Sequence, residues 1–174
     1  MPGSAEESGA ELPPEPRAAG AGYLVRRAGP ADHEDVTREL AAYLAFLGEE
    51  LDPAGIDHDV ADWQGEYDGI AGVMLVVVDP AGQVVGTAAV RRLEPGVIEL
   101  KRMWLRPACR GRGIARVLMD RCLEEARTLG ARALRLDSER RLEAAVRLYR
   151  GYGFEEIPDY NRNPRADVWM ELRL

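Results

Sequence analysis

Long hydrophobic runs are missing from this sequence. Its uninterrupted apolar stretches, such as residues 73–78, are far shorter than the ~20 residues that a helix needs to cross a bilayer. Residues 1–22 also lack a basic segment followed by an apolar one, which is the pattern of a secretory signal. We therefore expect a cytoplasmic protein that has no membrane partner.

Cysteine and histidine are scarce. The two cysteines, Cys109 and Cys122, are too few for a disulfide framework or for a zinc site built from four ligands. The two histidines, His33 and His58, have no second histidine or cysteine at the spacing of metal ligands. The expectation is free thiols in a reducing compartment and no bound metal.

An excess of positive charge is also absent. Asp and Glu number 30 against 23 for Lys and Arg, which gives a formal charge of −7. That balance disfavours a nucleic-acid partner and favours a cationic substrate such as an amine. Lysine is almost missing, because Lys101 is the only one. A GC-rich genome explains this bias, and we draw no function from it.

The first 22 residues lack the apolar content of a folded segment. Gly, Pro, Ala, Glu and Ser dominate them, and such a composition buries too little apolar surface to offset the entropy lost on ordering. We predict a disordered tail over residues 1–22. Residues 23–174 are enough for one domain with its own core.

The rest of the chain alternates strand and helix patterns. Residues 73–78 and 83–91 are rich in β-branched residues and flank a turn sequence, which predicts a hairpin, and residues 97–105 continue as a third antiparallel strand. A strong helix is predicted over residues 113–129. Further strands are predicted at residues 23–27, 133–137, 154–157 and 168–174, and further helices at residues 30–47 and 142–150. This order predicts a mixed α/β (α+β) fold, with a mixed central sheet of six to seven strands and helices on both faces.

The sharpest local pattern is Arg110-Gly111-Arg112-Gly113-Ile114-Ala115, between the end of a predicted strand and the start of a predicted helix. Free backbone N–H groups and the positive end of the helix dipole at such a turn form an anion site suited to a diphosphate. Arg110, Arg112 and Arg116 add positive charge around the same point. A glycine-rich turn before a helix is also typical of a tight connection with only a packing role.

This segment matches the R/Q-x-x-G-x-G/A signature of the Gcn5-related N-acetyltransferases, the GNAT superfamily. The later run from Ala145 to Phe154 resembles the family's A-x-x-L-Y-x-x-x-G-F element, and the strand before Arg106-Pro107 resembles its fourth strand. The sequence thus resembles a GNAT over residues 23–174. Its closing segment, residues 157–172, looks like that of a bacterial small-molecule subgroup.

The resemblance implies the GNAT fold and acetyl-CoA as co-substrate. In the family the fourth and fifth strands part, the pantetheine arm pairs with the exposed edge of the fourth, and the signature turn holds the pyrophosphate. One departure is Leu142, which stands where many GNATs have an asparagine. The implied cofactor contacts are Met103, Trp104, Leu105, Arg110, Gly111, Arg112, Gly113, Ile114 and Ala115.

Two residues are the catalytic candidates. Glu99 lies where some protein-acetylating GNATs carry a catalytic glutamate, and it would act as the general base that deprotonates the amine, directly or through water. Alternatively it is a strand-surface glutamate paired with Lys101 or Arg102. Tyr149 occupies the position of the family's L-Y tyrosine and would protonate the departing thiolate, with a packing tyrosine as the competing interpretation.

We therefore predict an N-acetyltransferase that acts on a small amine, such as an amino acid, by direct transfer in a ternary complex. Arg102, Tyr160 and Asn161 could hold a substrate carboxylate, and the acidic segment 48–72 is either a wall of an amine site or a solvated surface. The alternatives are a protein or peptide N-acetyltransferase and a non-catalytic acetyl-CoA-binding module. A dinucleotide-binding domain is disfavoured, because its glycine-rich turn would follow the first strand. The resemblance leaves a homodimer open.

Overall fold

The computed structural model describes residues 15–174. The strands are β1 Arg17–Ala19, β2 Tyr23–Arg27, β3 Gly72–Val78, β4 Val84–Glu94, β5 Val97–Leu105, β6 Ala133–Ser138, β7 Glu155–Ile157 and β8 Val168–Arg173. The helices are α1 His33–Leu47, α2 His58–Ala61, α3 Trp63–Glu66, α4 Ile114–Thr128 and α5 Glu143–Gly151, with 3-10 turns at Pro30–Asp32 and Pro107–Cys109. Every strand and helix predicted from the sequence is present, with ends shifted by a few residues.

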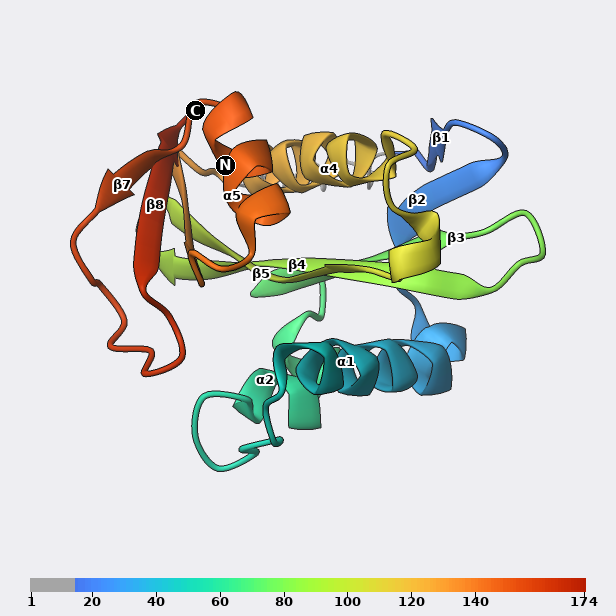
Figure 1. Ribbon diagram of the computed structural model, residues 1–174, viewed down its shortest axis with the longest axis horizontal. Helices are drawn as coiled ribbons and strands as arrows, with labels where there is room; N and C mark the ends of the chain where they lie inside the picture. The colour runs from blue at the N-terminus through green and yellow to red at the C-terminus, as the bar shows by residue number, and fades with distance from the viewer. Residues whose placement is uncertain (1–14) are drawn as a thin grey trace, which may run out of the picture.

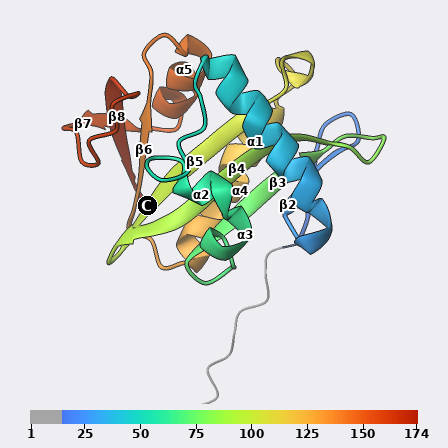
Figure 2. The ribbon, with the colours of Figure 1, turned by 90° about the horizontal axis from the view of Figure 1, so that it is seen from below.

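The strands form one eight-stranded mixed sheet in the order β1-β2-β3-β4-β5-β6-β8-β7. Helices α4 and α5 cover one face, while α1, α2 and α3 cover the other (Figures 1 and 2). The predicted mixed sheet with helices on both faces is thus confirmed. The strand count is slightly higher than the predicted six to seven, because a short strand precedes β2.

That extra strand lies inside the segment predicted as a tail. Residues 1–14 of the predicted tail lie outside the described residues, so their predicted disorder stays a prediction. Arg17–Ala19 pairs antiparallel with β2, Ala19 is buried, and the Glu15 carbonyl accepts a hydrogen bond from the buried Arg121. The ordered chain therefore begins before the predicted boundary at Tyr23. A short edge strand is held mainly through its backbone, which composition does not reveal.

Two hydrophobic cores lie on the two faces of the sheet. In β3, Leu75 and Val77 belong to the core shared with α4, whereas Met74 and Val76 belong to the core shared with α1. Burial on both faces explains why this strand is a continuous apolar run rather than an alternating one. The sheet is thereby fixed between two helical layers, and its strand ends can hold side chains in defined positions.

The sheet opens between β5 and β6. The two strands pair in parallel only from Val97 opposite Ala133 to Glu99 opposite Arg135. On the other side of β5, the register with β4 shifts between Thr87 and Ala89, and Arg102 there has a left-handed φ of 55°. This bulge bends β5 away from β6. From residue 100 onward, the β5 edge that faces β6 has no paired strand among residues 15–174.

Candidate active site

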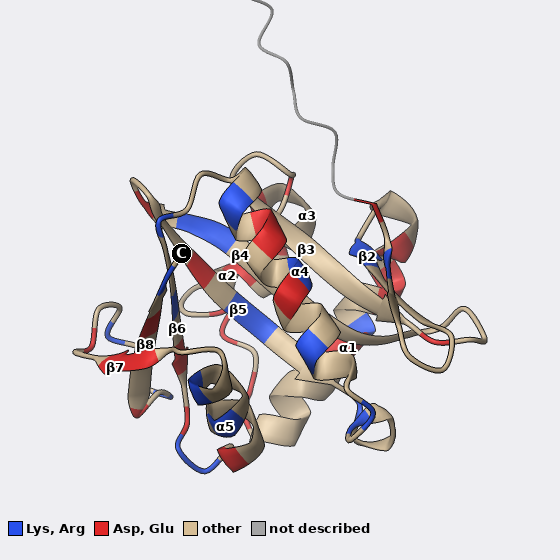
Figure 3. Cartoon of the chain, turned by 90° about the horizontal axis from the view of Figure 1, so that it is seen from above, with Lys and Arg blue, Asp and Glu red and all other residues tan. Residues whose placement is uncertain are grey.

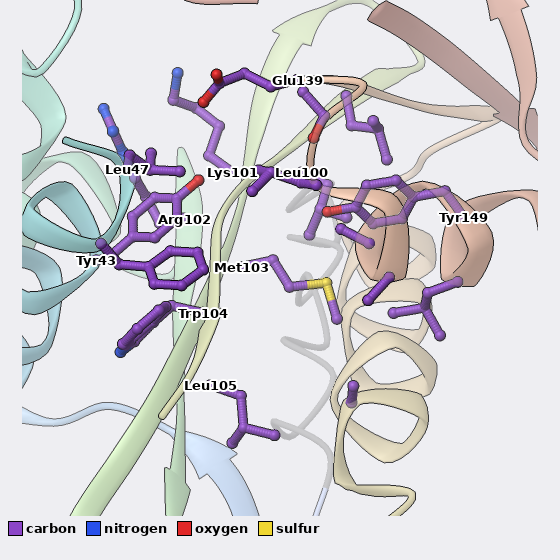
Figure 4. A pocket seen from close by; sticks show the side chains of 18 of the residues that line it. Tyr43, Leu47, Leu100, Lys101, Arg102, Met103, Trp104, Leu105, Glu139 and Tyr149 are labelled. Carbon is purple, nitrogen blue, oxygen red and sulfur yellow. The ribbon is translucent and has the colours of Figure 1, made fainter. Parts of the chain in front are cut away.

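A pocket of about 650 Å³ fills the opening between the parted strands. Its walls are the free edge of β5, the first turn of α4, helix α5, the end of β6, the C-terminal part of α1 with the segment that follows it, and the loop before β8. Figure 4 shows side chains of α1, β5 and α5 around the opening. The site residues predicted from the sequence that line it are Arg102, Met103, Trp104, Leu105, Arg110, Gly111, Gly113, Ala115 and Tyr149. The predicted residues that do not line it are Glu99, Arg112, Ile114, Tyr160 and Asn161.

One end of the pocket has a row of free backbone amides. Within residues 15–174, the N–H groups of residues 111–115 donate to no backbone or side-chain acceptor. Gly111 and Gly113 have φ values of 75° and 77°, which only glycine adopts at little cost and which turn successive amides toward the same side. Ile114 buries its side chain in the core, so only its backbone is available. Such a row at a helix N-terminus binds anions.

Positive charge surrounds the same turn. The Arg110 Nε donates to the Leu105 carbonyl at 2.9 Å, and its guanidinium lies over the Phe46 ring, 4.6 Å from the centroid. In the described part of the chain, Arg110, Arg112 and Arg116 form no ion pair with a carboxylate. Their charge is therefore available to a ligand with several phosphates.

Tyr149 projects from α5 into the middle of the pocket (Figure 4). Only 6% of the residue is exposed, and its ring packs against Phe154 with centroids 5.9 Å apart. Its hydroxyl has no hydrogen-bond partner among residues 15–174. Burial raises the pKa of Tyr149 well above its usual range, so the group stays a neutral phenol that can donate a proton.

Glu99 is 1% exposed and lies outside the pocket lining. Its carboxylate accepts hydrogen bonds from Arg91 Nε at 3.0 Å, from the Tyr160 hydroxyl at 2.9 Å and from Asn161 Nδ2 at 3.3 Å. Its ion-pair partner is thus Arg91 rather than either of the basic residues suggested from the sequence. The structure brings Glu99 together with Tyr160 and Asn161, and all three lie beside the pocket rather than on its surface. Burial and the Glu99 charge raise the pKa of Tyr160.

Arg102 lines the pocket, but its charge is balanced by carboxylates. Its side chain is 9% exposed and bonds to Asp59 through Nε at 3.0 Å and Nη2 at 2.5 Å. The same guanidinium pairs with Asp57 at 3.0 Å and donates to the Ile56 carbonyl at 3.1 Å. Burial alone would raise the pKa of Asp59, yet the Arg102 charge and hydrogen bonds lower it overall. Arg102 therefore fixes the segment after α1 against β5.

The half of the pocket opposite the amide row holds residues that sequence reasoning missed. The acidic segment 48–72 reaches the pocket at Ile56 and Asp57. Asn163 and Arg165 enter from the loop before β8, and Asp137 from the end of β6. Strand alternation could have indicated Asp137, because it directly follows the core residue Leu136. The loop residues carry no such signal.

The described residues were also compared with what a membrane span, a metal site or a disulfide would require. None of the helices within residues 15–174 is long and apolar enough to span a membrane. The same residues contain no group of three or more His, Cys, Asp and Glu side chains that could hold a metal ion. Cys109 and Cys122 are buried free thiols. Acidic and basic residues are interspersed over α4 and α5 (Figure 3).

Comparison with known proteins gives a consistent result. Residues 37–154 match the model of a family described as the acetyltransferase (GNAT) family. The chain is 32% identical over 147 residues to an uncharacterized N-acetyltransferase of Schizosaccharomyces pombe, covering 83% of this chain and 90% of that protein. A GNAT-family acetyltransferase from Staphylococcus aureus has a similar structure, with a TM-score of 0.75, 16% identity, and coverage of 87% and 98% of the two chains. A phosphinothricin acetyltransferase from Sinorhizobium meliloti, solved in complex with acetyl-CoA, has a TM-score of 0.69 at 21% identity and covers 87% and 88%.

Proposed function

Since this chain belongs to the acetyltransferase (GNAT) family, we propose that it moves an acetyl group from acetyl-CoA to the primary amine of a small molecule such as an amino acid. Family membership makes the protein a transferase, and the acceptor class is the part that we propose. One observation carries the proposal: a single pocket joins a free amide row at a helix N-terminus to an unpaired strand edge. The small-molecule subgroup belongs to the same proposal. The cytoplasmic location and a homodimer stay predictions from the sequence.

Two parts of the pocket, the amide row and the unpaired edge of β5, suit the chemistry of coenzyme A. The amides of residues 111–115, with Arg110, Arg112 and Arg116, would hold the diphosphate. The unpaired edge of β5 at Met103 to Leu105 would pair with the amide groups of the pantetheine arm, as an added strand does. Acetyl-CoA supplies the acetyl group as a thioester, whose carbon–sulfur bond breaks as the acceptor nitrogen bonds to the carbonyl carbon. A β5 backbone N–H in the same stretch would stabilise the negative charge on the carbonyl oxygen.

We assign Tyr149 the role of general acid. Its hydroxyl points into the pocket, and the absence of a hydrogen-bond partner among the described residues leaves that proton free for the reaction. Its raised pKa keeps it protonated at neutral pH, as a donor to a departing thiolate must be. The hydroxyl would give its proton to the sulfur and recover one from solvent.

We keep Glu99 as the general base and assign it an indirect role. The Tyr160 hydroxyl donates to Glu99, so it can pass that proton to the carboxylate as its oxygen receives another from water. Water would carry the proton from the pocket to Tyr160, because Tyr160 does not line the pocket either. The proton that the acceptor ammonium loses would reach Glu99 by this route. Such a relay is needed because the carboxylate itself does not line the pocket.

A small acceptor fits the half of the pocket opposite the amide row better than a peptide does, because contacts of Arg165 cross that half. Arg165 joins the loop before β8 to the segment after α1, through Asp57 at 2.9 Å, Glu49 at 2.8 Å and the Glu50 carbonyl at 2.7 Å. These bonds cross the acceptor side, where an extended peptide would need an open groove. This contact supports the small-molecule proposal over a protein N-acetyltransferase.

The test is CoA thiol release from acetyl-CoA with a panel of amines, peptides and a lysine-rich protein. Release above background with small amines, and an acetylated product of the expected mass, would support the proposal. Release with peptides or protein alone would replace it by the protein-modifying alternative. Tight CoA binding without release for any acceptor would leave a binding module.

A further inference from the structure

The half of the pocket opposite the amide row, where the acceptor would bind, is called here the acceptor half. Among the described residues, it contains one basic side chain that has no ion pair with a carboxylate. Three of the four basic residues there are neutralised: Arg102 by Asp57 and Asp59, Arg165 by Asp57 and Glu49, and Arg141 by Glu139. The fourth is Lys101, the only lysine of the chain, and its half-buried side chain has no ion pair or hydrogen bond among residues 15–174. Figure 4 shows it at the same end of the pocket as Glu139.

A negative charge without a cation lies in the same half. Asp137 accepts hydrogen bonds from the side-chain amides of Asn161 and Asn163, the latter at 3.1 Å, and forms no ion pair with another described residue. The other acidic side chains of this half, Asp57 and Glu139, already have arginine partners. Among the described residues, Lys101 and Asp137 are thus the two charged side chains of this half without an ion pair, and they are opposite in sign. The charge of Lys101 reaches Asp59 without a direct contact and helps to lower the pKa of that carboxyl group.

The sheet register places these two charges across the opening from each other. Glu99 of β5 pairs with Arg135 of β6, and side chains two residues apart on a strand point to the same face. Lys101 and Asp137, two residues beyond that pair on each strand, therefore share one face of the sheet. The strands part there, so the two charges lie on opposite sides of the gap and do not pair.

We propose that the acceptor is a zwitterion of the α-amino acid class, with Lys101 binding its carboxylate and Asp137 its ammonium group. This inference rests on the proposed function and names the acceptor chemistry of the same site. Partly buried charges are costly when unpaired, and a ligand with both signs compensates both at once. Asn161 bonds to Asp137 and to Glu99, so an ammonium group at Asp137 lies next to the residues that would take its proton.

Acceptors that differ only in the carboxylate test Lys101. A suitable series is L-methionine, L-methioninamide and 3-(methylthio)propylamine, with equivalent series for a small and an acidic side chain. The wild-type enzyme should prefer the amino acid over its amide in kcat/KM by roughly tenfold to a hundredfold, the effect of one hydrogen bond to a charged group. Lys101→Met should reduce that preference by at least about tenfold, and Lys101→Arg should retain most of it.

Two further variants separate binding from general electrostatics. Asp137→Asn should raise KM for the amino acid and the amide alike, because both carry the ammonium group. Arg173→Met removes a cation whose side chain is 92% exposed and does not line the pocket, and the preference should stay as in the wild type.

Several outcomes would overturn the proposal. Equal losses for all acceptors in Lys101→Met would indicate a structural role, and a lower melting temperature without a change in preference would indicate that Lys101 and Asp137 pair with each other. Acetylation of Lys101 itself, detected by intact mass and assigned to Lys101 rather than to the N-terminal amine by peptide mapping, would make this residue an acceptor rather than a binding group.

The failure of this inference is distinguishable from the failure of the proposed function. If amines without a carboxylate react as well as the amino acids do, only the present inference fails. If no amine supports thiol release, calorimetry of the same amino acids with the CoA-bound protein still shows whether the pocket binds them through Lys101. Binding that Lys101→Met abolishes would support the inference, and no binding in the wild type would contradict it.

Discussion

At the scale of single residues, Tyr149 is set apart by a buried hydroxyl that has no hydrogen-bond partner among residues 15–174. If it is the general acid, Tyr149→Phe should lower kcat about a hundredfold, the lower end of what positioned proton donors contribute. The loss should be in kcat rather than in the Kd for acetyl-CoA, since the hydroxyl acts on the leaving sulfur. Steady-state kinetics with the best acceptor of the panel, together with calorimetry, measure both quantities.

Tyr152 provides the matched control for that substitution. It follows α5, and its hydroxyl bonds to Asp120 at 2.6 Å and to the Arg116 carbonyl at 2.9 Å, outside the pocket lining. Tyr152→Phe should lower the free energy of unfolding by about 1 kcal/mol and leave kcat as in the wild type. An unchanged kcat in Tyr149→Phe would remove that residue as the essential acid.

The role of Glu99 is separable from its ion pair. Glu99→Gln removes the proposed base, so kcat/KM near neutral pH should fall about a hundredfold. It should recover at higher pH, because more of the acceptor's ammonium group is then already deprotonated in solution. Arg91→Met breaks the same ion pair but keeps the carboxylate, so it should retain most of the activity. The check is the pH profile of kcat/KM for both variants. Equal losses with parallel profiles would mean that the pair is structural.

The candidate site residues that line the pocket lie in continuous segments of the sequence. Arg110, Gly113 and Tyr149 each belong to a segment whose local spacing carries the information. Lys101 was noticed as the single lysine and as a possible ion-pair partner of Glu99, and Asp137 was taken as a strand end. Their significance depends on which other charges are neutralised. That pairing is set by contacts between distant segments, such as Arg165 with Asp57, which one sequence does not reveal.

At the scale of elements, the first turn of α4 is the feature on which cofactor binding depends. Gly113 has a φ of 77° and nothing within 4 Å of an added Cβ, so Gly113→Ala meets no clash and costs only backbone strain. That strain is roughly 1–2 kcal/mol for a left-handed residue. The new methyl group would also lie on the amide row in the pocket, so the Kd for acetyl-CoA should rise about tenfold, equivalent to ~1.4 kcal/mol.

The same helix offers a control at its other end. Gly130 follows α4, has a φ of 83° and likewise has nothing within 4 Å of an added Cβ. Gly130→Ala should therefore cost a similar free energy of unfolding without weakening acetyl-CoA binding. Calorimetry and urea unfolding on both variants make the comparison. Similar Kd values for the two variants would contradict the assignment of the amide row.

Elements were more predictable than the site, for a physical reason. Helix α4 has an apolar stripe and a glycine at each end, and β3 and β4 are rich in β-branched residues on either side of a turn, so local pattern and burial agree. The strand β1 has no such pattern. It is held by backbone pairing with β2, and backbone hydrogen bonds leave no signal in the order of the side chains. The bulge at Arg102 was also not predicted, although it helps to part β5 from β6.

At the scale of the whole molecule, buried carboxylates paired with arginine link stability to pH. The pKa values of Asp32, Asp57 and Asp59 are all lowered, in each case with an arginine among the causes. A carboxyl group whose folded pKa lies below its unfolded value of about 3.9 stabilises the fold above that pH. That contribution is lost as pH falls through the folded pKa, so the free energy of unfolding should decline below about pH 4.

Asp59→Asn isolates the largest of these contributions. Asp59 is fully buried against Arg102, so its removal leaves that buried cation with Asp57 as its remaining carboxylate partner and should cost roughly 3 kcal/mol at pH 7, the low end for a broken buried pair. With one titrating group fewer, the decline of the variant's stability below about pH 4 should be shallower than that of the wild type. Asp35→Asn, in an exposed pair with Arg38, should change stability by less than about 1 kcal/mol. Urea unfolding followed by circular dichroism at several pH values provides the test. Parallel pH dependences for the wild type and Asp59→Asn would show that the Arg102–Asp59 pair does not control acid stability. The segment after α1 would then be held against β5 by apolar contacts rather than by this ion pair.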